Sequence, residues 1–445
     1  MNRAPSTDRT KAPTPLRIYL ENGTHDMRNL GDAAMLTEAY RCIRAEWPDA
    51  DVYVSTGNPG RLERYCPGAI PVNVKGRRSL SVAWAPWRRL ETRAPGLSSA
   101  LRRLRLRHHS LVNRIWIYLI CRYLRQSAAD VEAFIRFLHS VDVLFYSGGG
   151  YFNDEFRVFM HELVSVGEIV QRLHRPVVAF GQGIGPLSTA LVARPVEGLL
   201  RGMTAVGARE NTSLQWVESR RVSPTLCRLT GDDALLAPDL PWPQAMGDAL
   251  GVNVRLSHYS GVELSGLRFL KVAVARFLEE MQLRRAQPVL IKDTDYESTR
   301  QALGELPLED CPFENAATLR AISACRVVLT GSYHAAVFAY ALGVTVVGLA
   351  ANPYYRQKLG GVAESFGTTP LVFTPTGTSS NDRDAAELQS LLHSAWTSAP
   401  DNHEPLLEAR RAQIAANRSF KREAFDLVNA KVEERRPTPD TVAGR

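Results

Sequence analysis

Metal-binding cysteine patterns are missing from this sequence. Its 445 residues include six cysteines, at positions 42, 66, 121, 227, 311 and 325, and none forms a CxxC pair or another metal-ligand spacing. Scattered cysteines in a long chain indicate reduced, mostly buried thiols, which are typical of a cytoplasmic protein. No other group of residues has metal-ligand spacing either, so we expect no metal site and no cofactor.

Long hydrophobic runs are missing as well. Residues 1–15 are polar and contain no apolar signal segment, so we expect them to form a disordered tail. The apolar stretch Ile115–Leu124 is too short to span a bilayer and is interrupted by Arg122. These absences predict a cytoplasmic protein without a membrane-spanning helix.

Acidic residues are nearly absent from one long stretch of an otherwise ordinary chain. Charged residues make up 22% of the sequence and apolar residues 45%, as in soluble globular proteins, and the net charge is +8. Glu91 is the only acidic residue in the stretch 75–125, which also contains twelve arginines and one lysine, so its net charge is +12 (13 minus 1). Trp84, Trp87 and Trp116 lie in the same stretch.

We interpret residues 75–125 as a basic amphipathic insertion, because their leucines also recur at helical spacing. The insertion either contacts an anionic membrane surface at the inner face of the plasma membrane or is a solvated helix face packed on its own domain. Binding to nucleic acid is not expected, since no nucleic-acid motif accompanies the basic residues.

A glycine-punctuated segment at residues 326–361 is the most informative part of the chain. One β-rich run ends at Gly331, a short apolar helix follows Ser332, and a second β-rich run begins at Thr345, which predicts a βαβ unit. Ser332 falls at the helix N-cap and His334 in the first turn. A helix start at the carboxyl edge of a parallel sheet favours anions, so His334 is the first catalytic candidate.

The same alternation of strand, polar loop and helix recurs along the chain, which predicts an α/β fold with doubly wound parallel sheets. Three aspartates, Asp32, Asp154 and Asp232, lie in such loops. For each of them, helix capping or turn formation competes with a role in ligand binding.

A proline-rich stretch at residues 238–247 is expected to link two Rossmann-like domains. The predicted N-terminal domain spans residues 16–240, the C-terminal domain residues 246–400, and a terminal helix with a tail residues 401–445, with the helix itself expected from Glu404 to Glu434. The carboxyl edges of the two sheets are expected to face each other across a cleft, the usual place for a ligand.

The loop motifs, taken in order, resemble those of the polysaccharide pyruvyl transferase family. The matching residues cover about residues 16–367 and are Asn29-x-Gly31-Asp32, Gly148-Gly149-Gly150 with Asp154, Gly181-Gln182-Gly183-Ile184-Gly185-Pro186, Ala208-Arg209-Glu210 with Ser213, Gly231-Asp232-Asp233, Asn253-Val254-Arg255, and His334-Ala335-Ala336 with Lys358. The resemblance implies a fold like that of GT-B glycosyltransferases. It also implies transfer of the carboxyvinyl group of phosphoenolpyruvate to a sugar of a cell-surface polysaccharide or its lipid-linked precursor, giving a pyruvate ketal.

Ser332 departs from the family's pattern, which usually has an arginine two residues before the histidine. The resemblance implies that this arginine binds the anionic donor, so either Arg209, Arg255, Lys292 or Lys358 replaces it, with Ser332 nearby, or the protein uses a different donor. Arg255 and Lys292 are equally well explained as surface charges at strand ends.

The remaining roles follow from the chemistry that the resemblance implies. The methylene carbon of the donor must be protonated, and histidine ordinarily titrates near neutrality, so His334 is predicted to be that acid or the group that protonates the phosphate. Asp32 is the second predicted catalytic residue. The other shared residues are predicted to bind the acceptor sugar, namely Asn29, Gly149, Gly150, Asp154, Gln182 and Asp232.

Two further functions stay open at the level of sequence. One is a glycosyltransferase with the same two-domain plan, which would show a nucleotide pocket at the C-terminal sheet. The other is a non-catalytic glycan-assembly protein in which Ser332 marks lost activity, and which would bind glycan without turning over a donor.

Overall fold

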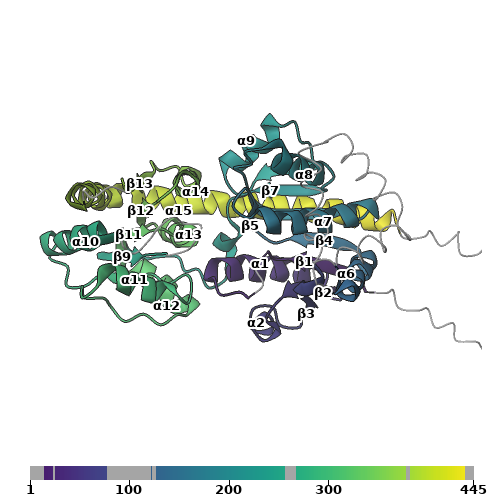
Figure 1. Ribbon diagram of the computed structural model, residues 1–445, viewed down its shortest axis with the longest axis horizontal. Helices are drawn as coiled ribbons and strands as arrows, with labels where there is room; N and C mark the ends of the chain where they lie inside the picture. The colour runs from purple at the N-terminus through teal and green to yellow at the C-terminus, as the bar shows by residue number, and fades with distance from the viewer. Residues whose placement is uncertain are drawn as a thin grey trace, which may run out of the picture.

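The computed structural model of the protein describes residues 15–23, 26–77, 122, 127–255, 267–376 and 381–435 (Figure 1). Almost all of the predicted tail at 1–15 and of the predicted basic insertion at 75–125 lies outside these ranges. Two α/β domains lie side by side, and one long helix runs along both (Figure 1). Within the described ranges, no helix has the length and apolar character needed to cross a membrane.

The described part of the N-terminal domain contains a parallel sheet of eight strands. Their order is β3 (Ile70–Asn73), β2 (Asp51–Thr56), β1 (Arg17–Glu21), β4 (Val143–Tyr146), β6 (Val177–Ile184), β7 (Ala205–Ala208) and β8 (Leu226–Leu229), and β5 (Gly149–Phe152) pairs with β6. The strand order reverses between β1 and β4. Such a reversal opens a crevice at the carboxyl edge of the sheet, where ligands bind.

Both faces of this sheet are buried. Consecutive side chains point to opposite faces, so Tyr19 and Leu144 join one apolar cluster while Leu20 and Phe145 join another. The helices of the domain are α1 (Leu30–Glu46), α2 (Pro59–Tyr65), α6 (Ala128–Ser140), α7 (Arg157–Arg172), α8 (Ala190–Arg201), α9 (Asn211–Ser219) and the short 3-10 helix η1 (Asp233–Leu236).

The C-terminal domain repeats the plan with a smaller sheet. Its described strands are all parallel and lie in the order β10 (Gln287–Pro288), β9 (Ala249–Asn253), β11 (Cys325–Thr330), β12 (Thr345–Leu349) and β13 (Leu371–Phe373). The strand order reverses between β9 and β11. The helices are α10 (Arg268–Glu280), α11 (Asp295–Leu303), α12 (Asn315–Ser323), α13 (Tyr333–Ala341) and α14 (Pro353–Ser365). The predicted α/β fold of two doubly wound, Rossmann-like domains is confirmed.

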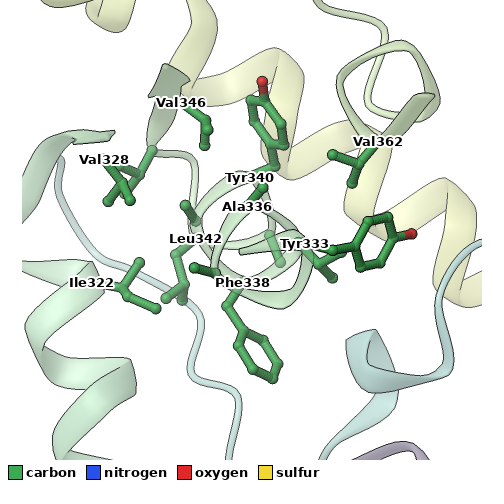
Figure 2. Close-up of a cluster of buried hydrophobic side chains, with 14 of the residues drawn as sticks. Ile322, Val328, Tyr333, Ala336, Phe338, Tyr340, Leu342, Val346 and Val362 are labelled. Atoms are coloured by element: carbon green, nitrogen blue, oxygen red, sulfur yellow. The ribbon is translucent and has the colours of Figure 1, made fainter. Parts of the chain in front are cut away.

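Helix α13 is enclosed on every side. All of its residues are buried, and a helix that is apolar all round belongs in a core rather than on a surface. Figure 2 shows its side chains projecting in different directions, with Val328, Val346 and Val362 around them. The position of His334 in the first turn of α13 is therefore fixed by close packing.

Helix α15 (Asn381–Glu433) ties the two domains together. Its first half packs against α10 and the C-terminal sheet, and its second half packs against the N-terminal domain (Figure 1). The predicted start of the terminal helix at Glu404 is wrong, because the helix begins at Asn381 and continues through Pro400 and Pro405. Each proline removes one backbone hydrogen bond, and packing on both domains outweighs that loss.

The first residues of the predicted basic insertion belong to the N-terminal core. Arg77 is fully buried, forms an ion pair with Glu21, and lies 3.3 Å from the carboxylate of Glu162. The prediction of a basic insertion that begins at residue 75 is therefore wrong at Arg77, whose charge is neutralised inside the domain. For the rest of residues 75–125 the insertion stays a prediction.

Candidate functional site

A buried carboxylate organises the edge of the C-terminal sheet where the strand order reverses. Asn253, which ends β9, donates a hydrogen bond of 2.9 Å to Oδ2 of Asp295. The same oxygen accepts from the backbone N–H groups of residues 291 and 292, each at 2.9 Å, and lies 3.4 Å from the guanidinium of Arg255. Asp295 therefore fixes both Arg255 and the loop after β10 at the ligand-binding edge of the sheet.

His334 lies at the same edge, because α13 follows β11. Its Nε2 atom is buried and has no hydrogen-bond partner among the described residues, and the same holds for Oγ of Ser332. Ser332 is the N-cap residue of α13, yet its side chain makes no capping bond, and its backbone N–H donates to Thr330 instead at 2.8 Å. Both atoms are therefore free to hydrogen-bond a ligand that reaches this edge.

The start of α1 brings a carboxylate from the other domain to His334. Oδ1 of Asn29 caps the helix by accepting from the N–H groups of Gly31 and Asp32, at 3.0 and 3.4 Å. The carboxylate of Asp32 is therefore not needed for capping, and its Oδ1 lies 3.9 Å from Nδ1 of His334. The interpretation of Asp32 as the cap is wrong, because Asn29 fills that role.

Gly31 allows the two domains to meet this closely. A Cβ atom on residue 31 would lie 2.5 Å from Cβ of His334 and closer still to its ring, which real side chains do not permit. Beside this contact, the N–H of Leu30 donates to the carbonyl of Ile291 at 2.8 Å, so the backbones of the two domains are hydrogen-bonded. The contact between Asp32 and His334 thus depends on a tight domain interface.

Arg209 reaches the same place from the end of β7. It passes over Gly183, where a Cβ atom would lie 2.6 Å from its guanidinium. The carboxylates of Glu210 and Asp232 hold it at 3.1 and 3.4 Å, and the guanidinium lies 4.0 Å from the ring centroid of Tyr333 in the other domain. A planar guanidinium suits such stacking, so Arg209 is firmly oriented toward α13.

Lys358 of α14 is the least neutralised cation of this cluster. Within the part of the chain that the structure describes, no carboxylate lies within ion-pair distance of its Nζ atom. Aromatic rings surround it, with the centroids of Tyr333, Tyr354 and Tyr355 at 5.2, 5.5 and 5.9 Å. Burial, with the charge of Arg209, lowers the pKa of Lys358 to about 8. Lys358 is therefore mostly charged at pH 7 and available to an anion.

These cations set the ionisation of the two catalytic candidates. Burial and the charges of Arg209, Lys358 and Arg255 lower the pKa of His334 well below its usual value, so the imidazole is neutral at pH 7. Burial raises the pKa of Asp32 to about 6, although the same three cations oppose that change. The prediction that His334 titrates near neutrality is therefore wrong in this structure.

The open space beside the cluster is small. A cavity of about 30 Å³ is lined by both domains, with Arg209 and Glu210 on one side and Tyr354 and Lys358 on the other. Such a volume holds one or two water molecules. A larger ligand therefore requires the side chains or segments that line this cavity to rearrange.

The structure brings most of the predicted catalytic and donor-binding residues together, namely Asp32, Arg209, Arg255, Ser332, His334 and Lys358. Two predicted acceptor residues, Gly150 and Asp232, lie against Arg209. Burial raises the pKa of Asp232 to about 6, against the opposing charge of Arg209. The direct role of each residue in binding or catalysis stays a prediction.

Five predicted residues have local structural contacts instead. Asn29 caps α1, and Lys292 pairs with it through the backbone in an isolated antiparallel bridge. Gln182 donates to the carbonyl of Ser147 at 2.5 Å, and Asp154 accepts from the N–H of Ser188 at 2.8 Å. Gly149 has no space for a side chain, because the ring of Tyr151 covers it. Their predicted roles in binding the donor or acceptor are untested.

Sequence reasoning missed two residues of the cluster. Glu210 orients Arg209 and accepts a hydrogen bond of 2.9 Å from Ser213. Its place beside Arg209 in a shared motif was a usable signal. Tyr333 lies under both Arg209 and Lys358, but an aromatic residue at the start of an apolar helix gives no sign of more than packing. Among the described residues, no three His, Cys, Asp or Glu side chains are grouped as metal ligands.

Solved structures of similar architecture define the class of fold. A putative UDP-N-acetylglucosamine 2-epimerase from Listeria monocytogenes has a TM-score of 0.53 at 12% identity, over 92% of this chain and 97% of that chain. The UDP-GlcNAc 2-epimerase from Methanocaldococcus jannaschii gives 0.51 at 10% identity, over 89% and 98%. The glycotransferase of kitacinnamycin gives 0.50 at 14% identity, over 94% and 100%. At these identities the likeness shows the fold alone, which is the GT-B plan of glycosyltransferases and epimerases.

Comparison of the sequence with protein families identifies the family of this chain. The sequence profile of the polysaccharide pyruvyl transferase family matches residues 29–353, which is most of the chain. The protein belongs to this family and is a transferase of polysaccharide biosynthesis. The matched range runs from the cap of α1 to the start of α14, so it includes the Asp32–His334 contact. No curated protein matches the chain.

Proposed function

We propose that the protein transfers the carboxyvinyl group of phosphoenolpyruvate to a sugar of a cell-surface polysaccharide or its lipid-linked precursor, forming a pyruvate ketal. The observation that carries this proposal is the convergence of Arg209, Arg255 and Lys358 on the Asp32–His334 contact. Phosphoenolpyruvate presents a carboxylate and a phosphate, so its binding requires more than one fixed cation.

The three cations replace the arginine that family members usually have at position 332. Arg209 and Arg255 are each oriented by a carboxylate, which keeps their geometry fixed, while Lys358 has aromatic neighbours and supplies the uncompensated charge. Ser332 contributes a buried hydroxyl without a partner among the described residues, and hydroxyl groups hydrogen-bond phosphate oxygens readily. Loss of the family's arginine is therefore compatible with donor binding.

Binding of the negatively charged donor changes the pKa values of both catalytic candidates. Its negative charges would offset the cations that lower the pKa of His334, and would raise the pKa of Asp32 further. Donor binding thus favours a proton on the Asp32–His334 pair. We assign the proton-donor role to the pair rather than to His334 alone.

The reaction then balances as follows. The pair gives its proton to the methylene carbon of the donor, and a sugar hydroxyl oxygen forms a bond to the adjacent carbon. A second hydroxyl of the same sugar forms the other ketal bond as the bond to phosphate breaks. Of the two hydroxyl protons released, one returns to the pair and the other leaves with inorganic phosphate.

The acceptor proposed for the enzyme also bears on where the enzyme works. A lipid-linked precursor lies at a membrane surface, and the predicted basic insertion at residues 75–125, apart from Arg77, carries charges and tryptophans suited to anionic headgroups. We therefore propose a cytoplasmic enzyme with a reversible contact at the inner face of the plasma membrane, and no nucleic-acid partner.

A nucleotide-sugar glycosyltransferase is the second candidate function. It is favoured by the fold, since the similar solved structures include a glycotransferase and epimerases named for UDP-N-acetylglucosamine. A nucleotide-sugar donor would also place a negatively charged diphosphate near the cations at the domain interface.

Ligand-induced thermal stabilisation separates the two candidates. We expect phosphoenolpyruvate, and not UDP-N-acetylglucosamine, to raise the Tm of the wild-type protein and of Lys271→Met, a control on the exposed face of α10. Lys358→Met should lose most of this response. His334→Ala should stay folded but release no phosphate from phosphoenolpyruvate when given the lipid-linked glycan fraction of membranes. Stabilisation by the nucleotide sugar alone would favour the glycosyltransferase.

A further inference from the structure

A second cavity, larger than the one at Lys358, lies beside α1. Its volume is about 410 Å³, within the range of roughly 300–1,000 Å³ that is typical of small-ligand sites. One face of α1 lines it through Leu30, Ala34 and Thr37, which recur at helical spacing. None of the predicted site residues lines it, and both domains contribute to its walls.

Planar polar side chains from both domains line this cavity. Arg28, Arg61 and Arg64 belong to the N-terminal domain, and Asp239, Glu314 and Asn315 belong to the linker and the start of α12. Arg61 makes one bond of 2.9 Å to a backbone carbonyl, and Arg64 has no hydrogen bond or ion pair with any residue that the structure describes. Arg28 pairs with Asp26 and Asp293, and Asn315 donates to Asp239 at 3.2 Å, so the unused hydrogen-bonding capacity of the lining is mainly that of Arg61 and Arg64.

An exposed aromatic ring completes the lining. Phe313 is 37% exposed, which makes it one of three large apolar side chains left exposed in the described part of the chain. The exposed Trp242 is explained by stacking of Arg410 at 3.8 Å, whereas Phe313 has no ring or cation contact with a described residue. Tyr65 lines the same cavity from α2. The cavity therefore offers aromatic surface from both domains.

Aromatic rings beside planar polar groups suit a saccharide. A sugar ring has an apolar C–H face that packs on an aromatic ring, and hydroxyls that pair with carboxylates, amides and guanidinium groups. The lining carries three arginines against two acids, so it is mixed in charge rather than strongly basic. A mixed lining fits a glycan better than a highly charged anion.

We infer that this cavity binds sugar units of the acceptor glycan that lie beyond the reacting sugar. The inference rests on the proposed function insofar as that function supplies a glycan acceptor. Leu30 lines the cavity while Asp32, two residues on and about 3 Å further along the axis of α1, faces His334, so the two sites are neighbours on the first turn of α1. Because both domains line the cavity, a bound glycan also favours the closed arrangement in which Asp32 meets His334.

Glycan binding can be measured without any donor. We would apply the fluorescently labelled full-length protein to an array of microbial oligosaccharides and measure Kd for the glycans retained. Two cavity variants, Phe313→Ala and the double variant Arg61→Gln/Arg64→Gln, should weaken binding at least tenfold. Arg136→Gln, an exposed arginine on α6, is the matched control and should bind as the wild type does.

Lys358→Met distinguishes this inference from the proposed function. It should lose stabilisation by phosphoenolpyruvate yet keep glycan binding, because Lys358 does not line the larger cavity. Glycan binding through the cavity without turnover of phosphoenolpyruvate would overturn the proposed function and leave the inference standing. Retention of wild-type glycan affinity by both cavity variants, or no retained glycan on the array, would overturn the inference.

Discussion

Replacing Gly31 with alanine should separate the two halves of the candidate site without unfolding either domain. The new Cβ would lie 2.5 Å from Cβ of His334, which cannot retreat because α13 is buried on all sides. Overpacking of this kind costs about 1–3 kcal/mol. The clash lies at the domain interface, so we expect this cost to hold Asp32 and His334 apart and to lower kcat/KM for phosphoenolpyruvate about 5- to 150-fold.

Gly198→Ala in α8 is the matched control for this experiment. Nothing lies within 4 Å of its new Cβ, so alanine should stabilise the helix by about 0.5–1 kcal/mol and leave activity unchanged. Phosphate release, thermal unfolding and small-angle scattering of both variants give the comparison. The reasoning fails if Gly31→Ala keeps wild-type kcat/KM, or if it loses activity only because it unfolds at a much lower temperature.

Other expected outcomes concern buried charges. Asp32→Asn should raise Tm at pH 8 but not at pH 4. The pKa of Asp32 is raised to about 6, so the wild-type carboxyl group loses its proton at a cost in stability as pH rises from about 4 to 6. Equal changes in Tm at both pH values would contradict this. The affinity of the wild type for phosphoenolpyruvate should fall as pH rises through 8, because Lys358 loses its proton there. The fall should be much smaller in Lys358→Arg. Parallel pH profiles for the two proteins would exclude Lys358 as a cation that binds the donor. Lys421→Met should destabilise the protein by about 3–5 kcal/mol in urea unfolding, because Asp233, 2.9 Å from Lys421, would be left buried without its cation. Adding Asp233→Asn should restore part of the lost stability. If the double variant is no more stable than Lys421→Met, the ion pair does not explain the loss.

The fold was predictable because its signals are local. Apolar β-rich runs end in glycine or a polar residue before helices, and that pattern specifies parallel strands with helical crossovers wherever it repeats. Helix α15 escaped this reasoning, because Pro400 and Pro405 lie inside it and proline normally marks a boundary. Packing on two domains decided its length, and packing cannot be read from a local pattern.

The site was predictable in its membership more than in its chemistry. His334, Lys358 and Arg209 stand in motifs that the sequence displays, and the structure brings them together. The ionisation of His334 was not predictable, because it depends on cations from three other elements that approach only in the folded chain. The same is true of Tyr333, whose role depends on the two cations over its ring.

Helix α15 has a consequence for how the chain folds during synthesis. Its last turns place Phe420, Phe425 and Val428 in the core of the N-terminal domain, beside strands that are made about 190 to 410 residues earlier. The ribosome delivers these side chains last, so the N-terminal domain completes its core only after the C-terminal domain has been made. A fragment that ends at the linker would therefore expose an apolar face and should aggregate, and the two domains, separate in outline, form a single folding unit.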